Sequence, residues 1–85
     1  MRLTDKIIEV LLYMKKHGKI TKNEYKRFGF YILMWYLRDN GIAWNDGVDE
    51  RGMKVWKLTQ KGEKIAELIE ELRRVWYGES ENTTA

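Results

Sequence analysis

A run of residues without a charged side chain, from position 28 to position 37, constrains the fold of this 85-residue chain more than any other feature. The run reads Phe-Gly-Phe-Tyr-Ile-Leu-Met-Trp-Tyr-Leu. A surface helix needs only about three or four apolar residues in two turns to pack on a core. The run therefore carries more apolar surface than folding requires. We expect its second face to contact a partner, a nucleic acid, another copy of the chain or the rest of the same domain.

Helical periodicity and capping residues predict two helices before this run. Thr4 is a good N-cap for a first amphipathic helix that ends at Gly18. Residues 19–21 are long enough to lend one or two residues to a small sheet. Thr21 and Glu24 have the spacing of a capping box, which predicts a short second helix over residues 22 to about 28.

The residues after the second helix predict a helix-turn-helix unit followed by a hairpin and a last helix. Helical spacing resumes after Gly29 and ends at Gly41, so a third helix follows a tight turn. Residues 42–44 and 53–58 are rich in β-forming residues and flank a polar, glycine-containing segment, which predicts a β-hairpin with a charged tip. Thr59 is expected to cap the last helix.

This order of elements predicts an α+β, mostly helical fold. The length fits a single domain over residues 1–77, and residues 78–85 read as a disordered tail without an apolar anchor. No stretch approaches the roughly 18 apolar residues of a membrane span, and the first residues lack the pattern of a signal peptide. We therefore expect a cytoplasmic protein that does not interact with membranes, associated with the nucleoid if the source is prokaryotic.

The sequence offers no set of side chains for catalysis or metal binding. It contains no cysteine and one histidine, His17. Its carboxylates are scattered along exposed helix faces, and no glycine-rich phosphate loop is present. We expect no enzyme activity, no cofactor and no metal.

Charge is distributed unevenly along the chain. Residues 1–57 carry 12 Lys and Arg against 7 Asp and Glu, whereas residues 58–85 carry 4 against 6. Six basic residues lie between Lys15 and Arg27, opposed only by Glu24. Such a cluster fits an electrostatic contact with a phosphate backbone, although a solvated helix surface would carry the same charges.

Two segments resemble the winged helix-turn-helix family of archaeal and bacterial transcription regulators. Residues 37–42, Leu-Arg-Asp-Asn-Gly-Ile, are similar to the end of the family's recognition helix, where the chain enters the wing. Residues 57–62, Lys-Leu-Thr-Gln-Lys-Gly, are similar to the junction between the wing and the last helix. The likeness extends over residues 3–76. It implies a three-helix core, a β-hairpin wing and a long C-terminal helix.

The resemblance also implies a DNA-binding transcription regulator that acts as a homodimer on double-stranded DNA. The third helix would lie in the major groove, while the second helix and the wing would contact phosphates. The residues that would contact the DNA backbone are Lys22, Lys26, Arg27, Arg51 and Lys54.

The third helix departs from the family where bases would be read. On a helical wheel the inner face holds Phe30, Leu33, Met34 and Leu37, and the outer face holds Tyr31, Ile32, Trp35 and Tyr36. Polar side chains that discriminate bases are expected on that outer face, but only Arg38 supplies a guanidinium nearby. The four outer residues and Arg38 could contact DNA or a protein partner, and the outer face could also be covered from within the domain.

The last helix offers a candidate dimer surface. Its apolar stripe contains Ile65, Leu68, Ile69 and Leu72, with Val75 or Trp76 at the end. The same stripe could instead pack on the first helix. Our hypothesis is a dimeric DNA-binding regulator; the alternatives are a winged-helix protein-interaction module that uses the third helix, and a sequence-tolerant chromatin or architectural DNA binder.

Overall fold

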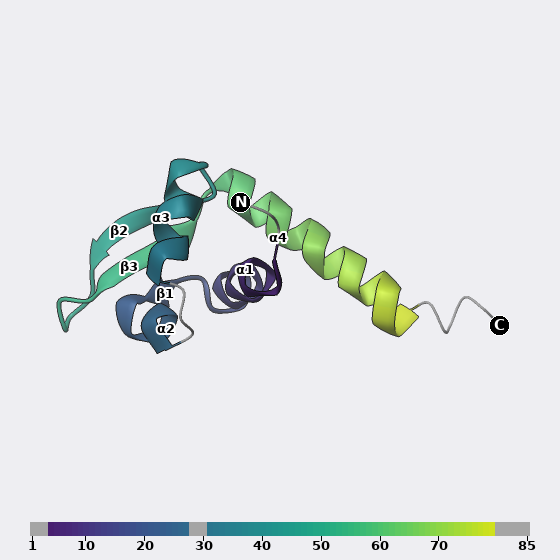
Figure 1. The fold of residues 1–85 in the computed structure, drawn as a ribbon, viewed down its shortest axis with the longest axis horizontal. Coiled ribbons are helices and arrows are strands. Elements are labelled where there is room, and N and C mark those ends of the chain that lie inside the picture. The colour runs from purple at the N-terminus through teal and green to yellow at the C-terminus, as the bar shows by residue number, and fades with distance from the viewer. Residues whose placement is uncertain (1–3, 28–30, 80–85) are drawn as a thin grey trace.

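The computed structural model describes residues 4–27 and 31–79 and has an α+β, mostly helical fold with one small sheet (Figure 1). Its elements are α1 (Asp5–His17), β1 (Ile20–Thr21), α2 (Lys22–Arg27), α3 (Tyr31–Asp39), β2 (Ala43–Val48), β3 (Lys54–Leu58), α4 (Gln60–Arg73) and η1 (Arg74–Glu79), a π-helical continuation of α4. The general fold class expected from the sequence is confirmed.

The helix boundaries follow the capping residues. The N–H of Ile7 donates to the Thr4 hydroxyl at 3.3 Å, and α1 ends where Gly18 adopts the left-handed conformation with φ of 83°. The Thr21 N–H donates to the Glu24 carboxylate at 2.8 Å, as a capping box requires. These contacts are local, which explains why sequence spacing alone predicted the starts of α1 and α2.

The three strands form an antiparallel sheet in the order β1-β3-β2. Strand β2 begins at Ala43 and continues to Val48, four residues beyond the predicted strand, with a register shift between Asn45 and Val48. Two side-chain contacts hold this extension against β3: the Asn45 amide donates to the Val55 carbonyl oxygen at 3.0 Å, and Lys57 pairs with Asp46 at 2.8 Å. Polar residues that resembled a loop thus belong to the hairpin.

The core lies where α1, α3 and α4 meet the sheet. Its largest fully buried side chains are Trp56, Leu11, Met14, Ile20, Met34, Leu37 and Val10. The end of α3 is tied to the start of α4 by the Thr59 hydroxyl, which donates to the Gly41 carbonyl oxygen at 2.5 Å. A side chain at Gly62 would collide with the carbonyl oxygen of Ile42, so only glycine allows this close approach.

The molecule is elongated, with principal extents of 52 × 24 × 23 Å. Figure 1 shows that the C-terminal part of α4 and η1 project away from the sheet, opposite to the tip of the β2–β3 hairpin.

The helix continues through Gly78 and Glu79, where the sequence predicted the start of a disordered tail, and the rest of that expected tail lies outside the described residues. Among the described helices, none is both long and apolar enough to cross a lipid bilayer.

Candidate functional site

Helix α2 is fixed on the body of the domain by one carboxylate. The Tyr13 hydroxyl of α1 donates to Glu24, and both the N–H and the hydroxyl of Thr21 donate to the other oxygen of the same group. Burial raises the pKa of Glu24, but the hydrogen bonds from Tyr13 and Thr21 and the nearby His17 outweigh burial and hold the pKa below its usual value. Glu24 therefore remains ionised and positions α2 beside α3.

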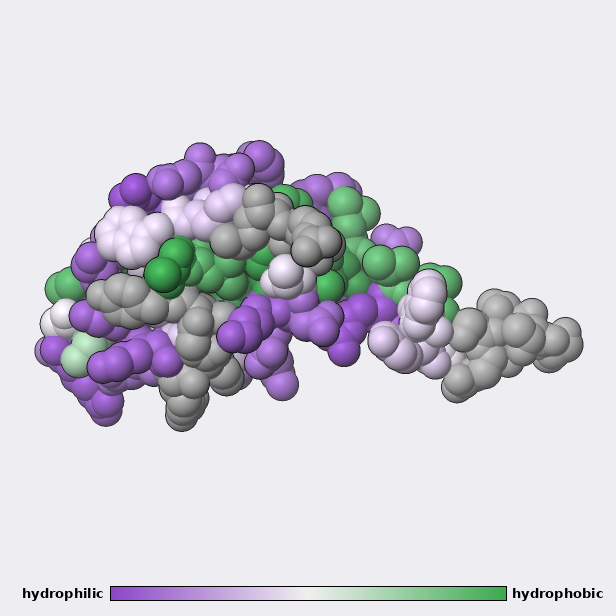
Figure 2. Space-filling model, viewed as in Figure 1, coloured by the Kyte–Doolittle hydropathy of each residue, from purple (hydrophilic) through white to green (hydrophobic). Residues whose placement is uncertain are grey.

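The basic residues expected to contact a DNA backbone lie on α2 and the hairpin. Lys26 is exposed on α2, whereas Lys22 is half-buried at its start. Arg51 is exposed at the tip of the hairpin and Lys54 on β3, and the Arg27 side chain lies outside the described residues. Figure 2 shows hydrophilic side chains over this end of the molecule.

The tip of the hairpin is organised by Asp49. Its carboxylate accepts hydrogen bonds from the N–H groups of Arg51 and Met53, each at 2.9 Å. The Asp49 N–H donates to the Met53 carbonyl oxygen at 2.8 Å. The backbone on either side of Arg51 is thus held in place, and its exposed side chain extends from a defined turn.

The inner face of α3 is confirmed where it is described. Leu33, Met34 and Leu37 are all buried, and Phe30 lies outside the described residues. The outer face departs from the expectation at Tyr36, which is half-buried and packs against the core. At about 100° per residue, Tyr36 lies about 60° around the helix from the buried Leu33, at the boundary of the two faces. Fewer than four side chains of α3 therefore point outward.

Trp35 is the centre of a small aromatic and cationic cluster. Its ring is 37% exposed and meets the buried ring of Trp56 edge-on, with 5.8 Å between the centroids. The Arg38 guanidinium carbon lies 4.5 Å from the Trp35 centroid, and Lys54 Nζ lies 4.8 Å from it. The ring therefore connects α3 with β3, and it brings two cations from different elements to one place.

The remaining outer residues of α3 differ in what is known of their exposure and their contacts. Ile32 is 76% exposed, and nothing is described of the Tyr31 side chain. Arg38 is exposed, but its Nε and Nη2 both donate to one carboxylate oxygen of Asp39, at 3.1 and 2.9 Å. The Arg38 guanidinium must therefore break its hydrogen bonds with Asp39 before it can bind a base or a phosphate in the same way.

The apolar stripe of α4 divides into two parts. Ile69 is buried and Ile65 is half-buried against the core, so these two residues are not available for a partner. Leu68, Leu72 and Trp76 are exposed, at 60% for Leu72 and 70% for Trp76. Val75 and Tyr77 are exposed beside them, and we call Leu68, Leu72, Val75 and Trp76 the outer stripe.

The sequence placed Trp35 and Arg38 together on α3 but missed the contacts of Trp35 with Trp56 and Lys54. The only signal for these contacts is the alternation along β3, which places Lys54 and Trp56 on the same face of the strand. Nothing in the sequence indicates that this face meets Trp35, because the contact joins residues about twenty positions apart. Long-range contacts of this kind depend on how the hairpin folds back on α3.

No protein-family model, curated protein or solved structure matches this chain. Within residues 4–27 and 31–79, no group of three His, Asp or Glu side chains could hold a metal ion. What the site offers chemically is therefore a set of cations on α2, α3 and the hairpin, arranged around one partly exposed indole ring.

Proposed function

We propose that this chain is a winged helix-turn-helix protein that binds duplex DNA as a homodimer and regulates transcription. Its nucleic-acid face would consist of α2, α3 and the β2–β3 hairpin, which acts as the wing. The observation that carries the proposal is the cluster around Trp35, where Arg38 of α3 and Lys54 of the wing flank one ring at 4.5 and 4.8 Å. A recognition helix and a wing that present cations side by side suit one stretch of phosphate backbone.

The same geometry favours contact with the backbone over reading of bases. Arg38 is occupied by Asp39, and α3 otherwise presents apolar and aromatic side chains. Bidentate contacts from Arg, Asn or Gln supply most direct discrimination between bases. We therefore expect specificity to come from thymine methyl groups and DNA shape, and to be weak.

The homodimer is supported by the outer stripe of α4 and η1. Leu68, Leu72, Val75 and Trp76 are exposed on one projecting helix. Figure 2 shows several hydrophobic areas over this part of the molecule, and exposed apolar patches usually mark interaction sites. A two-fold dimer through this stripe would present two copies of the α2, α3 and wing face.

A salt titration tests the DNA-binding proposal. Affinity for a random-sequence duplex is measured by fluorescence anisotropy at a series of salt concentrations. We expect log affinity to fall linearly with log salt, with a slope of about −0.9 for each phosphate contact. The double variant Lys26→Gln with Arg51→Gln should weaken binding to all sequences and make the slope shallower by roughly two.

The matched control is Lys64→Gln, which removes an exposed charge from α4, far along the chain from the proposed face. It should leave both the affinity and the slope unchanged. If the wild type does not bind duplex DNA at low salt, or if Lys64→Gln weakens binding as much as the double variant does, the proposed nucleic-acid face is wrong.

A protein-interaction module is the second candidate, and the exposure of Ile32 beside Trp35 favours it. Aromatic and aliphatic anchors of this kind supply much of the binding energy at protein interfaces. The salt titration separates the two candidates, since an apolar interface would leave the chain unable to bind DNA even at low salt.

A further inference from the structure

A groove between α1 and the C-terminal part of α4 lies outside the proposed nucleic-acid face of α2, α3 and the hairpin, although Lys15 and Lys16 of the basic cluster in the sequence line it. It has a volume of about 820 Å³, within the range of pockets that hold small organic ligands. Its walls come from two elements: Leu12, Lys15 and Lys16 from α1, and Glu70, Arg73, Arg74, Tyr77 and Gly78 from α4 and η1. None of these lining residues belongs to α3 or to the hairpin, so the groove can be tested separately from DNA binding.

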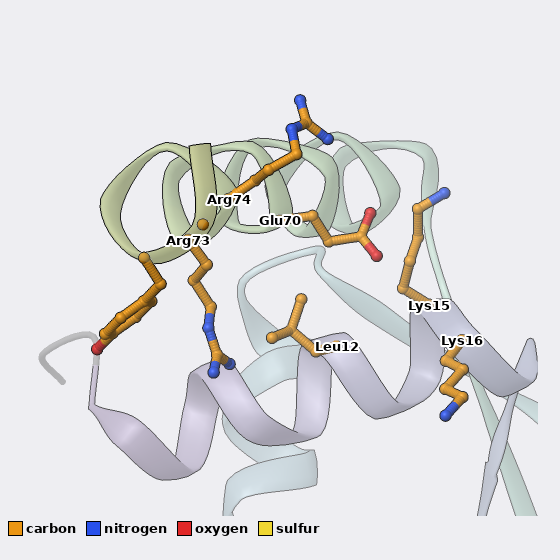
Figure 3. Close-up of a pocket in the computed structure, with 8 residues that line it drawn as sticks. Leu12, Lys15, Lys16, Glu70, Arg73 and Arg74 are labelled. Carbon is orange, nitrogen blue, oxygen red and sulfur yellow. The ribbon is translucent and has the colours of Figure 1, made fainter. Parts of the chain in front are cut away.

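The side chains that enter the groove are few and chemically distinct. Figure 3 shows Leu12 of α1 directed into the gap from one side, and Glu70 and Arg73 of α4 from the other. Lys16 and Arg74 are drawn pointing away from the gap. The interior therefore combines an apolar surface with one guanidinium and one carboxylate.

Arg73 is the unusual member of this set. In the part of the chain that the structure describes, no carboxylate forms an ion pair with its guanidinium, whereas Lys15 pairs with Glu63 at 3.5 Å. The guanidinium carbon of Arg73 lies over the Tyr77 ring, 6.0 Å from the ring centroid. A guanidinium that faces a partly apolar groove without a carboxylate is available to an anionic ligand.

The backbone changes its form at the same place. The α-helix ends at Arg73, and η1 continues as a π-helix that carries Arg74, Tyr77 and Gly78 of the groove wall. π-helical turns are rare and occur frequently at functional sites. The change in helix type is a second observation at the groove, separate from its charge.

We propose that this groove binds a small aromatic carboxylate. The carboxylate of the ligand would pair with Arg73, and its ring would lie against Leu12 and Tyr77. Lys16 and Arg74 point away from the gap, but with Lys15 they surround it with positive charge, and together with Arg73 they outnumber the single carboxylate of Glu70, which favours an anion over a cation. A neighbouring hollow on the other side of Arg73 and Tyr77 is lined by Asp5 and Glu9, so the ligand's carboxylate belongs on the side toward Lys15.

The test uses three ligands that share one ring system and differ in charge: naphthoate, naphthylmethanol and naphthylmethylamine. Each is titrated into the full-length chain by calorimetry, and amide chemical shifts locate the bound ligand. We expect naphthoate to bind at least roughly tenfold more tightly than the neutral alcohol, the range of a charge-assisted hydrogen bond. The amine should bind most weakly, and the largest shifts should fall at Leu12, Arg73 and Tyr77.

Three single variants of α4 complete the test. Arg73→Gln should weaken naphthoate binding roughly tenfold and leave the alcohol unaffected. Glu70→Gln removes the carboxylate inside the groove and should strengthen naphthoate binding. Lys64→Gln removes a charge outside the groove and should change nothing.

Two results would overturn the proposal. One is equal binding of all three ligands, which would indicate an apolar surface without an anion site. The other is a set of shifts confined to the outer stripe at Leu68, Leu72 and Trp76. Neither result bears on the proposed DNA binding, because the salt titration with duplex DNA reports on α2, α3 and the hairpin.

Discussion

Helix α3 and the α4–η1 helix both carry more apolar side chains than a solvent-facing helix requires, but the rest of the domain covers part of the excess on α3 and leaves the outer stripe of α4–η1 exposed. On α3, Tyr36 packs against the core and Trp35 lies between Trp56 and two cations. On α4 and η1, the outer stripe of Leu68, Leu72, Val75 and Trp76 stays exposed along a projecting helix (Figures 1 and 2).

The difference arises from what lies next to each helix. The hairpin folds back beside α3 and supplies Trp56 and Lys54 to cover Trp35. Helix α4 packs on α1, which buries Ile69, whereas the side chains of the outer stripe stay more than half exposed. Tyr36 and the covered part of Trp35 therefore stabilise the fold, whereas Ile32 stays exposed. The surface that we propose for a second copy of the chain is on α4.

The largest effect on stability should come from removing a buried side chain of α3. Leu37 is fully buried, so Leu37→Ala should lower the free energy of unfolding by about 2 to 5 kcal/mol. Ile32→Ala, on the exposed face of the same helix, should change it by less than about 0.5 kcal/mol. Urea denaturation followed by circular dichroism measures both, and similar losses from the two variants would show that Ile32 is covered after all.

The sequence predicted the inner face of α3 better than its outer face. Burial of Leu33, Met34 and Leu37 follows from helical spacing, which is a local property of the chain. The cover over Trp35 depends on contacts with Lys54 and Trp56, which a helical wheel does not represent. The wheel also treats the two faces as opposite halves, whereas Tyr36 lies at their boundary and reaches the core.

A smaller but distinct effect is expected on oligomeric state. Leu72→Glu places a charge in the middle of the outer stripe and should weaken the dimer by about 2 kcal/mol or more, roughly thirtyfold in the dissociation constant. Ile32→Glu adds the same charge to α3 and should leave the dimer intact. Sedimentation equilibrium over a dilution series measures this, and a wild type that stays monomeric throughout would remove the dimer from the proposal.

For α4 and the hairpin, local patterns predicted the elements but not their neighbours. Thr59 marked the start of α4 because its cap involves only the next three residues, whereas the need for glycine at position 62 comes from the close approach to Ile42, twenty positions away. Apolar spacing placed Ile65, Leu68, Ile69 and Leu72 on one stripe, yet only packing on α1 decides which of them are buried. The extension of β2 to Val48 was missed because it depends on contacts of Asn45 and Asp46 with the opposite strand.

The smallest expected effect is the coupling between Trp35 of α3 and Lys54 of the hairpin, which tests whether their contact links the two elements. A double-mutant cycle of Trp35→Leu with Lys54→Gln should give a coupling energy of about 0.5 to 1 kcal/mol in urea denaturation, the range for an exposed cation–π pair. The matched cycle of Trp35→Leu with Lys64→Gln should give no coupling, because Lys64 lies on α4.

Absence of coupling in the first cycle would mean that Lys54 does not contact the Trp35 ring, and the hairpin would then not be held against α3 by this contact. If the coupling is present and Trp35→Leu also lowers affinity for every DNA duplex alike, Trp35 acts by positioning Arg38 and Lys54 and not by reading bases.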